Sequence, residues 1–232
     1  MKYIKKDITP KARQALATFI RLEKNKAHYN NFKQSDGKGE VQESLLKEQG
    51  FLCAYCMRRI AMPPKIEHWV TREKCDADKM PLLTLDYDNL LAVCDGTTPT
   101  NGQIDEHCDQ SRSKSNRELT INPISGQLIQ QIKFLKNGTI ESNNENISED
   151  INQDKALNLN ALFLRDARRN VYGSVKKLID IKCRKATTPL QAQKIIAEIV
   201  KDWSTKKSNA EGLLQFKEYC AVVPYFFKKR TA

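Results

Sequence analysis

Residues 51–70, FLCAYCMRRIAMPPKIEHWV, decide how the middle of this chain folds. The C-x-x-C spacing places Cys53 and Cys56 on one tight turn, where both thiolates can bind the same tetrahedral zinc ion at about 2.3 Å. Farther along the stretch, residues 65–70 alternate enough between apolar and polar side chains to predict a short strand. The stretch therefore predicts a metal-binding knuckle followed by a strand.

A tetrahedral zinc ion needs two further ligands from elsewhere in the chain. Cys94 ends the apolar run 90–94, which is typical of a buried strand, and Cys108 follows a loop that contains glycine. A set of four cysteines leaves no coordination position open for chemistry, so the sequence predicts a structural Zn²⁺. His107 or Cys75 is an alternative for one of the ligands.

A carboxylate and an imidazole stand next to each other at the end of the expected strand 65–70. Magnesium prefers carboxylate oxygens together with phosphate oxygens and waters, which makes Glu67 a candidate ligand. An imidazole with a pKa near 6.5 can take a proton from water at neutral pH, which makes His68 a candidate general base. The alternative interpretation is that the pair is structural.

Patterns outside this region predict an α+β protein with three segments: an N-terminal helical segment (1–50), a zinc-binding core with an appended hairpin (51–150) and a basic helical region (151–232). Capping signals predict one helix after Thr9-Pro10 and another that ends at Gly50. Asn137-Gly138 predicts a hairpin. We expect loops over 71–84 and 95–106, a linker over 143–154, and helices over 155–185, over 189–203 and from 210 onward.

Composition and charge exclude several classes of protein. The nine-residue run from Tyr219 to Phe227 is the longest apolar stretch, too short to cross a bilayer, and no secretory signal is visible. We therefore expect a soluble cytoplasmic protein whose cysteines are reduced. The net charge of +11 divides into +5 over residues 1–52, −4 over 53–150 and +10 over 151–232. Basic ends around an acidic centre suit a protein that holds a polyanion and metal cations.

The order of the motifs resembles a known family. C-x-x-C, a strand ending in Glu-His, Asn-Leu-x-x-x-Cys and a last cysteine before an acidic residue resemble the zinc-stapled HNH nuclease motif, which implies a ββα-metal core. More narrowly, the segments CAYC, IEH, LDYDNLLAVC, HCD and ALNLNALFLRDAR resemble the PtuB-type HNH subunit of Septu and retron anti-phage defence systems. The resemblance is dense over residues 50–123 and thinner over 155–170.

The resemblance implies a role for each matching position. His68 would be the general base that activates water against the scissile phosphate, and Asn89 would brace the loop between the strands and so orient that histidine. Glu67 would bind a catalytic Mg²⁺ or Mn²⁺ ion. Asp109 occupies the position of the family's final histidine and would complete this metal site, a departure that leaves His107 as an alternative ligand. Two residues farther along could contact substrate phosphates or could simply be solvated: Arg112 and Lys114.

These roles imply a metal-dependent HNH endonuclease, the effector of an anti-phage defence system. Its substrate would be DNA, or RNA such as tRNA, and the motif does not choose between them. The resemblance further implies an ABC-type ATPase of the PtuA kind as partner and, in retron-type systems, a reverse transcriptase with its RNA–DNA product. The competing interpretation is a catalytically inactive zinc-ribbon module that binds nucleic acid or a partner protein. Such a module has no use for Glu67, His68 and Asn89 in that order.

Overall fold

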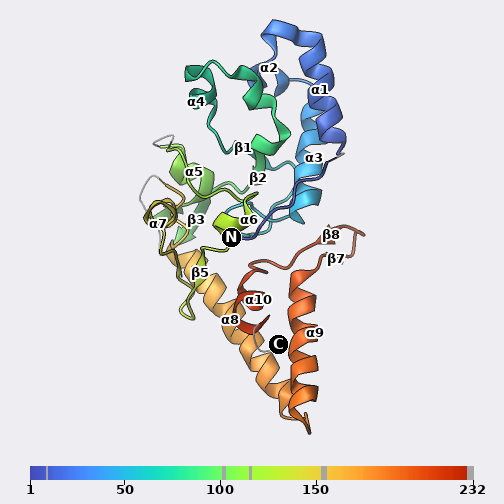
Figure 1. Cartoon of the computed structure of the whole chain (residues 1–232), viewed down its shortest axis with the longest axis vertical. Helices are drawn as coiled ribbons and strands as arrows, with labels where there is room; N and C mark the ends of the chain where they lie inside the picture. Colours follow the sequence, from blue (N-terminus) through green and yellow to red (C-terminus); the bar gives the residue numbers. More distant parts are fainter. Residues whose placement is uncertain (9, 101–102, 115–116, 153–155, 229–232) are drawn as a thin grey trace.

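The computed structural model describes residues 1–8, 10–100, 103–114, 117–152 and 156–228. It is a mixed α+β structure, in which short antiparallel strand pairs lie between a group of N-terminal helices and the long C-terminal helices (Figure 1). Across these described ranges, no helix combines the length and the apolar character needed to cross a membrane.

Both helices expected in the N-terminal segment are present, and they pack along each other. The helices of this segment are α1 (Lys11–Glu23), η1 (Lys24–Lys26), α2 (Tyr29–Phe32) and α3 (Gly37–Gln49). The last of them stops at Gly50, as predicted, because this residue has a left-handed φ of 62° and a Cβ there would collide with the ring of Phe216. Thr9, expected to cap the first helix, lies outside the described residues.

The central region is built on an antiparallel pair of strands, β1 (Lys65–His68) and β2 (Leu90–Val93). Every residue of β2 is buried, in keeping with its continuous apolar sequence. In the register of the pair, Glu67 opposes Leu91 and His68 opposes Leu90. The short helix α5 (Cys108–Arg112) follows in this region. Both predicted strands are therefore present, and their register places the Glu-His pair at the end of β1.

Two segments expected to be loops have regular structure, so those predictions were wrong. Residues 71–84 contain α4 (Arg72–Ala77), which forms because Oγ1 of the preceding threonine accepts a hydrogen bond from the Lys74 N–H at 3.2 Å. They lead into η2 (Pro81–Leu85) and η3 (Tyr87–Asn89). Residues 95–106 contain two strands of an antiparallel pair, since threonine favours extended structure: β3 (Thr97–Thr100) and β4 (Gln103–Glu106). The Asn-Gly pair at 101–102, expected to lie in a loop, falls outside the described residues.

The predicted linker over 143–154 was also wrong, because this polar segment contains the helix α7 (Glu145–Asn152). Ile147 and Ile151 stand four residues apart on one face of the helix and are completely buried. Asp150 is buried too, and its carboxylate accepts two backbone N–H groups. A few apolar residues at helical spacing were enough to attach this segment to the core.

The hairpin around Asn137-Gly138 is confirmed, with strands β5 (Lys133–Phe134) and β6 (Ile140–Glu141). The chain enters the hairpin from the short helix α6 (Gly126–Ile129). Gly138 has a φ of 87°, and a Cβ at this position would collide with the Arg165 carbonyl. Only glycine can therefore occupy this turn.

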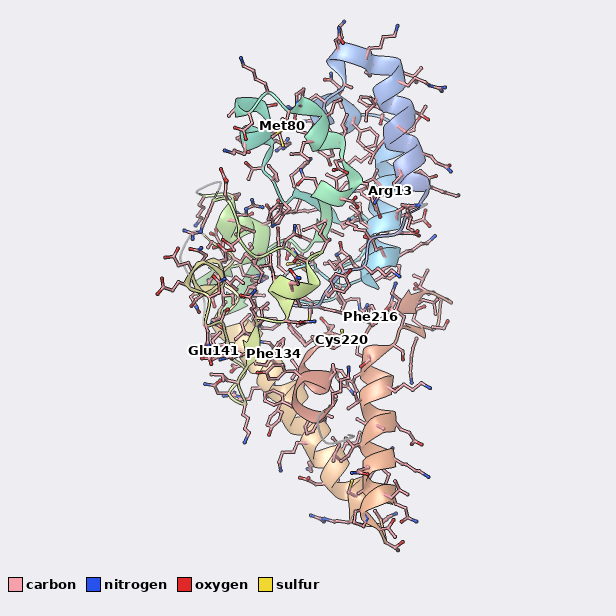
Figure 2. All side chains as sticks on the ribbon, in the orientation of Figure 1. Arg13, Met80, Phe134, Glu141, Phe216 and Cys220 are labelled. Atoms are coloured by element: carbon pink, nitrogen blue, oxygen red, sulfur yellow. The ribbon has the colours of Figure 1, made fainter. Side chains whose placement is uncertain are left out.

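The C-terminal helices extend away from the central region (Figure 1). They are α8 (Leu162–Cys183), α9 (Pro189–Ser204) and α10 (Val222–Phe227). The first begins later than predicted. The helix expected from residue 210 begins only at Val222, because the residues before it form the strand pair β7 (Lys207–Ser208) and β8 (Leu214–Gln215). At the junction with the central region, the rings of Phe134 and Tyr225 lie 5.2 Å apart; Figure 2 labels Phe134 there.

The largest apolar core draws on all three segments predicted from the sequence. It contains Leu45 from the first, Tyr55 from the second and Leu164 from the third, each of them completely buried. A smaller cluster joins α8, α9 and α10. The three-segment division stays a prediction, and the shared core holds the central region between the other two.

Candidate functional site

Four cysteines meet in the interior of the central region. The Sγ atoms of Cys53, Cys56, Cys94 and Cys108 all lie within 4.8 Å of one another, and all four residues are buried. Cys53 Sγ lies 3.9 Å from Cys108 Sγ, and Cys56 Sγ lies 3.8 Å from Cys94 Sγ. A tetrahedral zinc site with Zn–S bonds of about 2.3 Å has S–S edges of about 3.8 Å. The cluster therefore has the dimensions to hold a metal ion such as zinc.

Backbone hydrogen bonds build this cluster. Met57 N donates to Cys53 O at 3.1 Å and closes the knuckle turn, and Ala54 N donates to Ala92 O at 3.1 Å and ties the knuckle to β2. Because Cys94 comes directly after β2, the same contact sets the distance between the first two cysteines and the third.

The electrostatics of the cluster also favour a cation. Burial raises the pKa of the Cys56 and Cys108 thiols well above the ordinary value. Hydrogen bonds from Cys108 and the other thiols lower the pKa of Cys94. Four thiolates can share this buried space only if a positive ion compensates their charge.

The two alternative zinc ligands lie outside the four-sulfur set. His107 is buried beside it, with Nδ1 3.2 Å from Cys108 Sγ and Nε2 3.4 Å from an Arg58 nitrogen. Cys75 lies elsewhere, with its sulfur 3.8 Å from the carbonyl oxygen of Val70. The set that comes together is therefore the set of four cysteines.

A cavity of about 580 Å³ lies where β1 meets α5. Glu67 and His68 from β1 line it, together with Asp109 and Arg112 from α5. Three of the four residues expected to be catalytic thus share one cavity with a buried arginine. The alternative cation ligand, His107, is not among the lining residues and faces the cysteines instead.

His68 is held in one orientation and one tautomer. Its Nε2 lies 3.0 Å from the carbonyl oxygen of Thr84, and because a carbonyl can only accept, Nε2 carries the proton and Nδ1 is unprotonated. The ring of Tyr29 meets the imidazole edge to face, with centroids 4.5 Å apart. Burial lowers the pKa of His68 to about 4, so the imidazole is neutral at physiological pH. A neutral ring with an unprotonated Nδ1 can accept a proton at that atom.

Glu67 stands between a cation and another carboxyl group. Arg112 Nη1 donates to its Oε1 at 2.5 Å, and the Tyr55 hydroxyl lies 3.4 Å from the same oxygen. Burial is the main reason that the pKa of Glu67 is raised to about 8, and the negative charge of Asp109 is the second. Two carboxyl groups that interact across a polar cavity form a donor set suited to Mg²⁺ or another hard divalent cation.

Asn89 is not among the residues that line the cavity; its side chain connects the segment after β1 to η2. Its Nδ2 donates to the carbonyls of Val70 and Leu83, each at 3.1 Å, and its Oδ1 accepts from Val70 N at 2.7 Å. Val70 follows His68 by two residues, and Leu83 directly precedes Thr84, the hydrogen-bond partner of the imidazole. Asn89 thus holds both sides of the His68 environment.

The two residues considered for phosphate contacts have different surroundings. Arg112 is only 2% exposed, and besides Glu67 it donates to the carbonyls of His68 and Trp69 at 3.0 and 2.7 Å. Its guanidinium therefore holds the end of β1. Lys114 is exposed, forms an ion pair with Glu106 and does not line the cavity. Phosphate binding by either residue stays a prediction.

Sequence reasoning missed several residues that line the cavity, among them five from the N-terminal helices and the start of α4. Tyr29, Lys33 and Lys38 come from the N-terminal helices, and Thr71 and Arg72 stand at the start of α4. No motif joins the first three to the Glu-His pair, since they precede it by about thirty residues and more, and the region around 71 was expected to be an irregular loop. Only the packing of α2 and α3 against the central region brings them together.

No protein-family model matches this chain, and no curated protein matches it either. The site is therefore interpreted from its own geometry.

Proposed function

We propose that this protein is a metal-dependent endonuclease that hydrolyses phosphodiester bonds in nucleic acid. The observation that supports it best is the meeting, in one cavity, of a neutral His68 whose tautomer is fixed with the interacting carboxyl groups of Glu67 and Asp109. Phosphodiester hydrolysis needs a base for water, a cation against the developing charge and a held substrate. The cavity offers His68 as a candidate base, and Glu67 and Asp109 as candidate ligands of the cation.

His68 is the general base in this proposal. Nδ1 accepts the proton of the attacking water, while Nε2–H stays bonded to the Thr84 carbonyl. The Thr84 carbonyl, which accepts from Nε2–H, stabilises the positive charge that forms on the ring. Asn89 and Tyr29 keep the ring in place during this transfer.

Glu67 and Asp109 would hold the divalent cation. Bound there, Mg²⁺ or Mn²⁺ would supply charge neutralisation at the scissile phosphate and the leaving oxygen. Arg112 fixes the Glu67 carboxylate by its hydrogen bond, and so orients this ligand toward the cavity. In the same proposal the four cysteines hold a structural zinc ion, which ties β2 to α5.

The biological setting is proposed on the sequence resemblance alone. In this setting the protein is the effector of an anti-phage defence system. Its partners are a PtuA-like ATPase and, in retron-type systems, a reverse transcriptase with its RNA–DNA product. The competing candidate, an inactive zinc-ribbon binding module, does not need an interacting pair of carboxyl groups beside a base.

The test is cleavage of plasmid, single-stranded DNA, total RNA and tRNA with Mg²⁺ or Mn²⁺, by the protein alone and with the neighbouring ATPase if its operon encodes one. We expect the natural protein to cut at least one polymer and His68→Ala to lose about 10²- to 10⁴-fold in rate. The variant should keep its zinc and its circular dichroism spectrum. Unchanged cleavage by the variant would remove His68 as the base. Nucleic-acid binding by the zinc-loaded protein without cleavage under any of these conditions would favour the binding module.

A further inference from the structure

Part of the cavity lining comes from a part of the chain that carries no nuclease motif. Besides the residues of β1 and α5, the lining includes Lys33, directly after α2, and Lys38, in the first turn of α3. Arg72, at the start of α4, is a third cation in the lining. The catalytic candidates thus share the cavity with a group of basic side chains.

Within the described residues, none of these cations forms an ion pair with a carboxylate. Lys33 is exposed and Lys38 half-buried. Arg72 donates to Asn30 Oδ1 at 2.9 Å, and its guanidinium lies 6.0 Å from the centroid of the Tyr29 ring. The positive charge of the three groups is therefore not neutralised by a direct partner among the residues that the structure describes.

The acidic groups of the cavity are paired with other groups or exposed. Glu67 is buried and already paired with Arg112, and Asp109 interacts with Glu67. Glu73 also lines the cavity, but this residue is exposed. The two carboxyl groups suited to a cation thus come from β1 and α5, and the three cations suited to phosphate come from the residue after α2, from α3 and from α4.

We propose that Lys33, Lys38 and Arg72 bind a phosphate group that flanks the scissile one, so that the substrate is a polynucleotide strand and not a small phosphodiester. This inference rests on the proposed function and adds the residues that hold its substrate strand beside the scissile bond. The N-terminal helices then form half of the binding site. At about 580 Å³, the cavity is within the usual size of a ligand pocket and can take more than one phosphate group.

Binding is measured first, without cleavage, in the His68→Ala background. The probes are oligonucleotides of about 20 nucleotides as single-stranded DNA, duplex DNA and RNA, titrated by fluorescence anisotropy over a series of salt concentrations. The test variant carries Lys33→Gln and Lys38→Gln. The control carries Arg21→Gln and Lys26→Gln, which removes the same charge from exposed positions of the same segment that do not line the cavity.

Each lost phosphate contact reduces the slope of log K against log salt by about 0.7 to 0.9 and, near 0.1 M salt, weakens binding about five- to tenfold. We expect both effects in the Lys33/Lys38 variant for at least one probe, and less than about a twofold change in the control. The probe that responds identifies the polymer. Equal effects in the two variants would overturn the proposal, and so would a parent protein that binds none of the three probes.

Cleavage then separates this role from catalysis. In proteins with native His68, the Lys33/Lys38 variant should lose activity on the responding polymer by about tenfold or more. It should hydrolyse bis(4-nitrophenyl) phosphate, which has no flanking phosphate, as fast as the natural protein. Equal losses on both substrates would overturn the flanking-phosphate role. If the natural protein cleaves neither substrate, the proposed function fails, while the binding result still decides whether Lys33 and Lys38 bind phosphate.

Discussion

The side-chain amide of Asn89 bonds to both polar groups of the Val70 backbone: Oδ1 accepts from Val70 N at 2.7 Å, and Nδ2 donates to Val70 O at 3.1 Å. The backbone of Asn89 accepts from Trp69 N at 2.9 Å, and its side chain then extends the pairing of β1 and β2 to Val70. Its second Nδ2 contact, to Leu83 O, reaches the segment whose next carbonyl accepts from the imidazole. The orientation of the proposed base therefore depends on a residue that does not touch it.

Replacing Asn89 with alanine should lower both stability and turnover. The change removes three hydrogen bonds to half-buried backbone groups of Val70 and Leu83, which costs about 1 to 3 kcal/mol of unfolding free energy. A freed imidazole should reduce kcat more than it changes KM, by about tenfold or more. Guanidinium denaturation and steady-state cleavage measure the two effects. The exposed Asn170→Ala serves as control, and an Asn89→Ala protein with natural kcat would contradict the bracing role.

Replacing Cys94 with serine should abolish metal binding at the cysteine cluster. Three sulfur ligands and a hydroxyl bind zinc more weakly than four sulfurs, and the cluster ties β2 to α5. We expect zinc content, measured by atomic emission, to fall from about one ion per chain to nearly none, with loss of the cooperative thermal transition. Cys183→Ser, at a half-exposed cysteine at the end of α8, should keep both. Full zinc retention by Cys94→Ser would exclude the four-cysteine site.

Neutralising the carboxyl groups of the cavity should change the cation requirement of cleavage. Glu67→Gln and Asp109→Asn keep the size of each side chain but remove a negative charge, so the Mg²⁺ concentration needed for half-maximal activity should rise about tenfold or more. The matched control is Glu73→Gln, which removes an exposed carboxylate that also lines the cavity. An unchanged Mg²⁺ dependence in the first two variants would place the cation elsewhere.

Glu67 should lower the unfolding free energy as pH rises between pH 6.5 and pH 8. Burial raises the pKa of Glu67 from 4.5 to about 8, so the folded chain binds more protons and stability falls as pH rises. Burial lowers the pKa of His68 from 6.5 to about 4, so below pH 6.5 the unfolded chain binds more protons at this residue and stability rises with pH. Burial also lowers the pKa of the Met1 amine from 8.0 to about 5, so this group opposes the effect of Glu67 up to pH 8.

Between pH 6.5 and 8 we therefore expect the unfolding free energy of the natural protein to change little, and that of Glu67→Gln to increase with pH by up to about 1.4 kcal/mol per pH unit, in buffer without Mg²⁺ or Mn²⁺. The variant loses the opposing contribution of Glu67, since an amide does not titrate and can still accept from Arg112. Urea denaturation at both ends of the interval measures it. The same slope in the natural protein and in Glu67→Gln would assign the pH dependence to another group.

Local patterns in the sequence predicted much of the central region. The spacing of Cys53 and Cys56 predicted a knuckle, and Asn137-Gly138 predicted a hairpin that is present. These predictions succeed because each feature is specified by a few neighbouring residues: a turn that brings two thiols together, or a glycine at a positive φ. The failures over 143–154 and from residue 210 have the opposite cause, since there weak local preferences yield to contacts with distant parts of the chain.

By itself, the sequence determined which residues have the chemistry for a zinc site, a base and a cation site, because these depend on residue type and short spacing. Only the tertiary structure decided which of them meet. It placed Asp109 in the cavity with Glu67 and left His107 at the cysteines, and it buried Arg112 in contact with the end of β1. It also placed Lys33 and Lys38 in the lining of the cavity that contains His68. The physical reason is that the packing of α2 and α3 against the central region depends on side chains distributed over the whole core, which no short motif encodes.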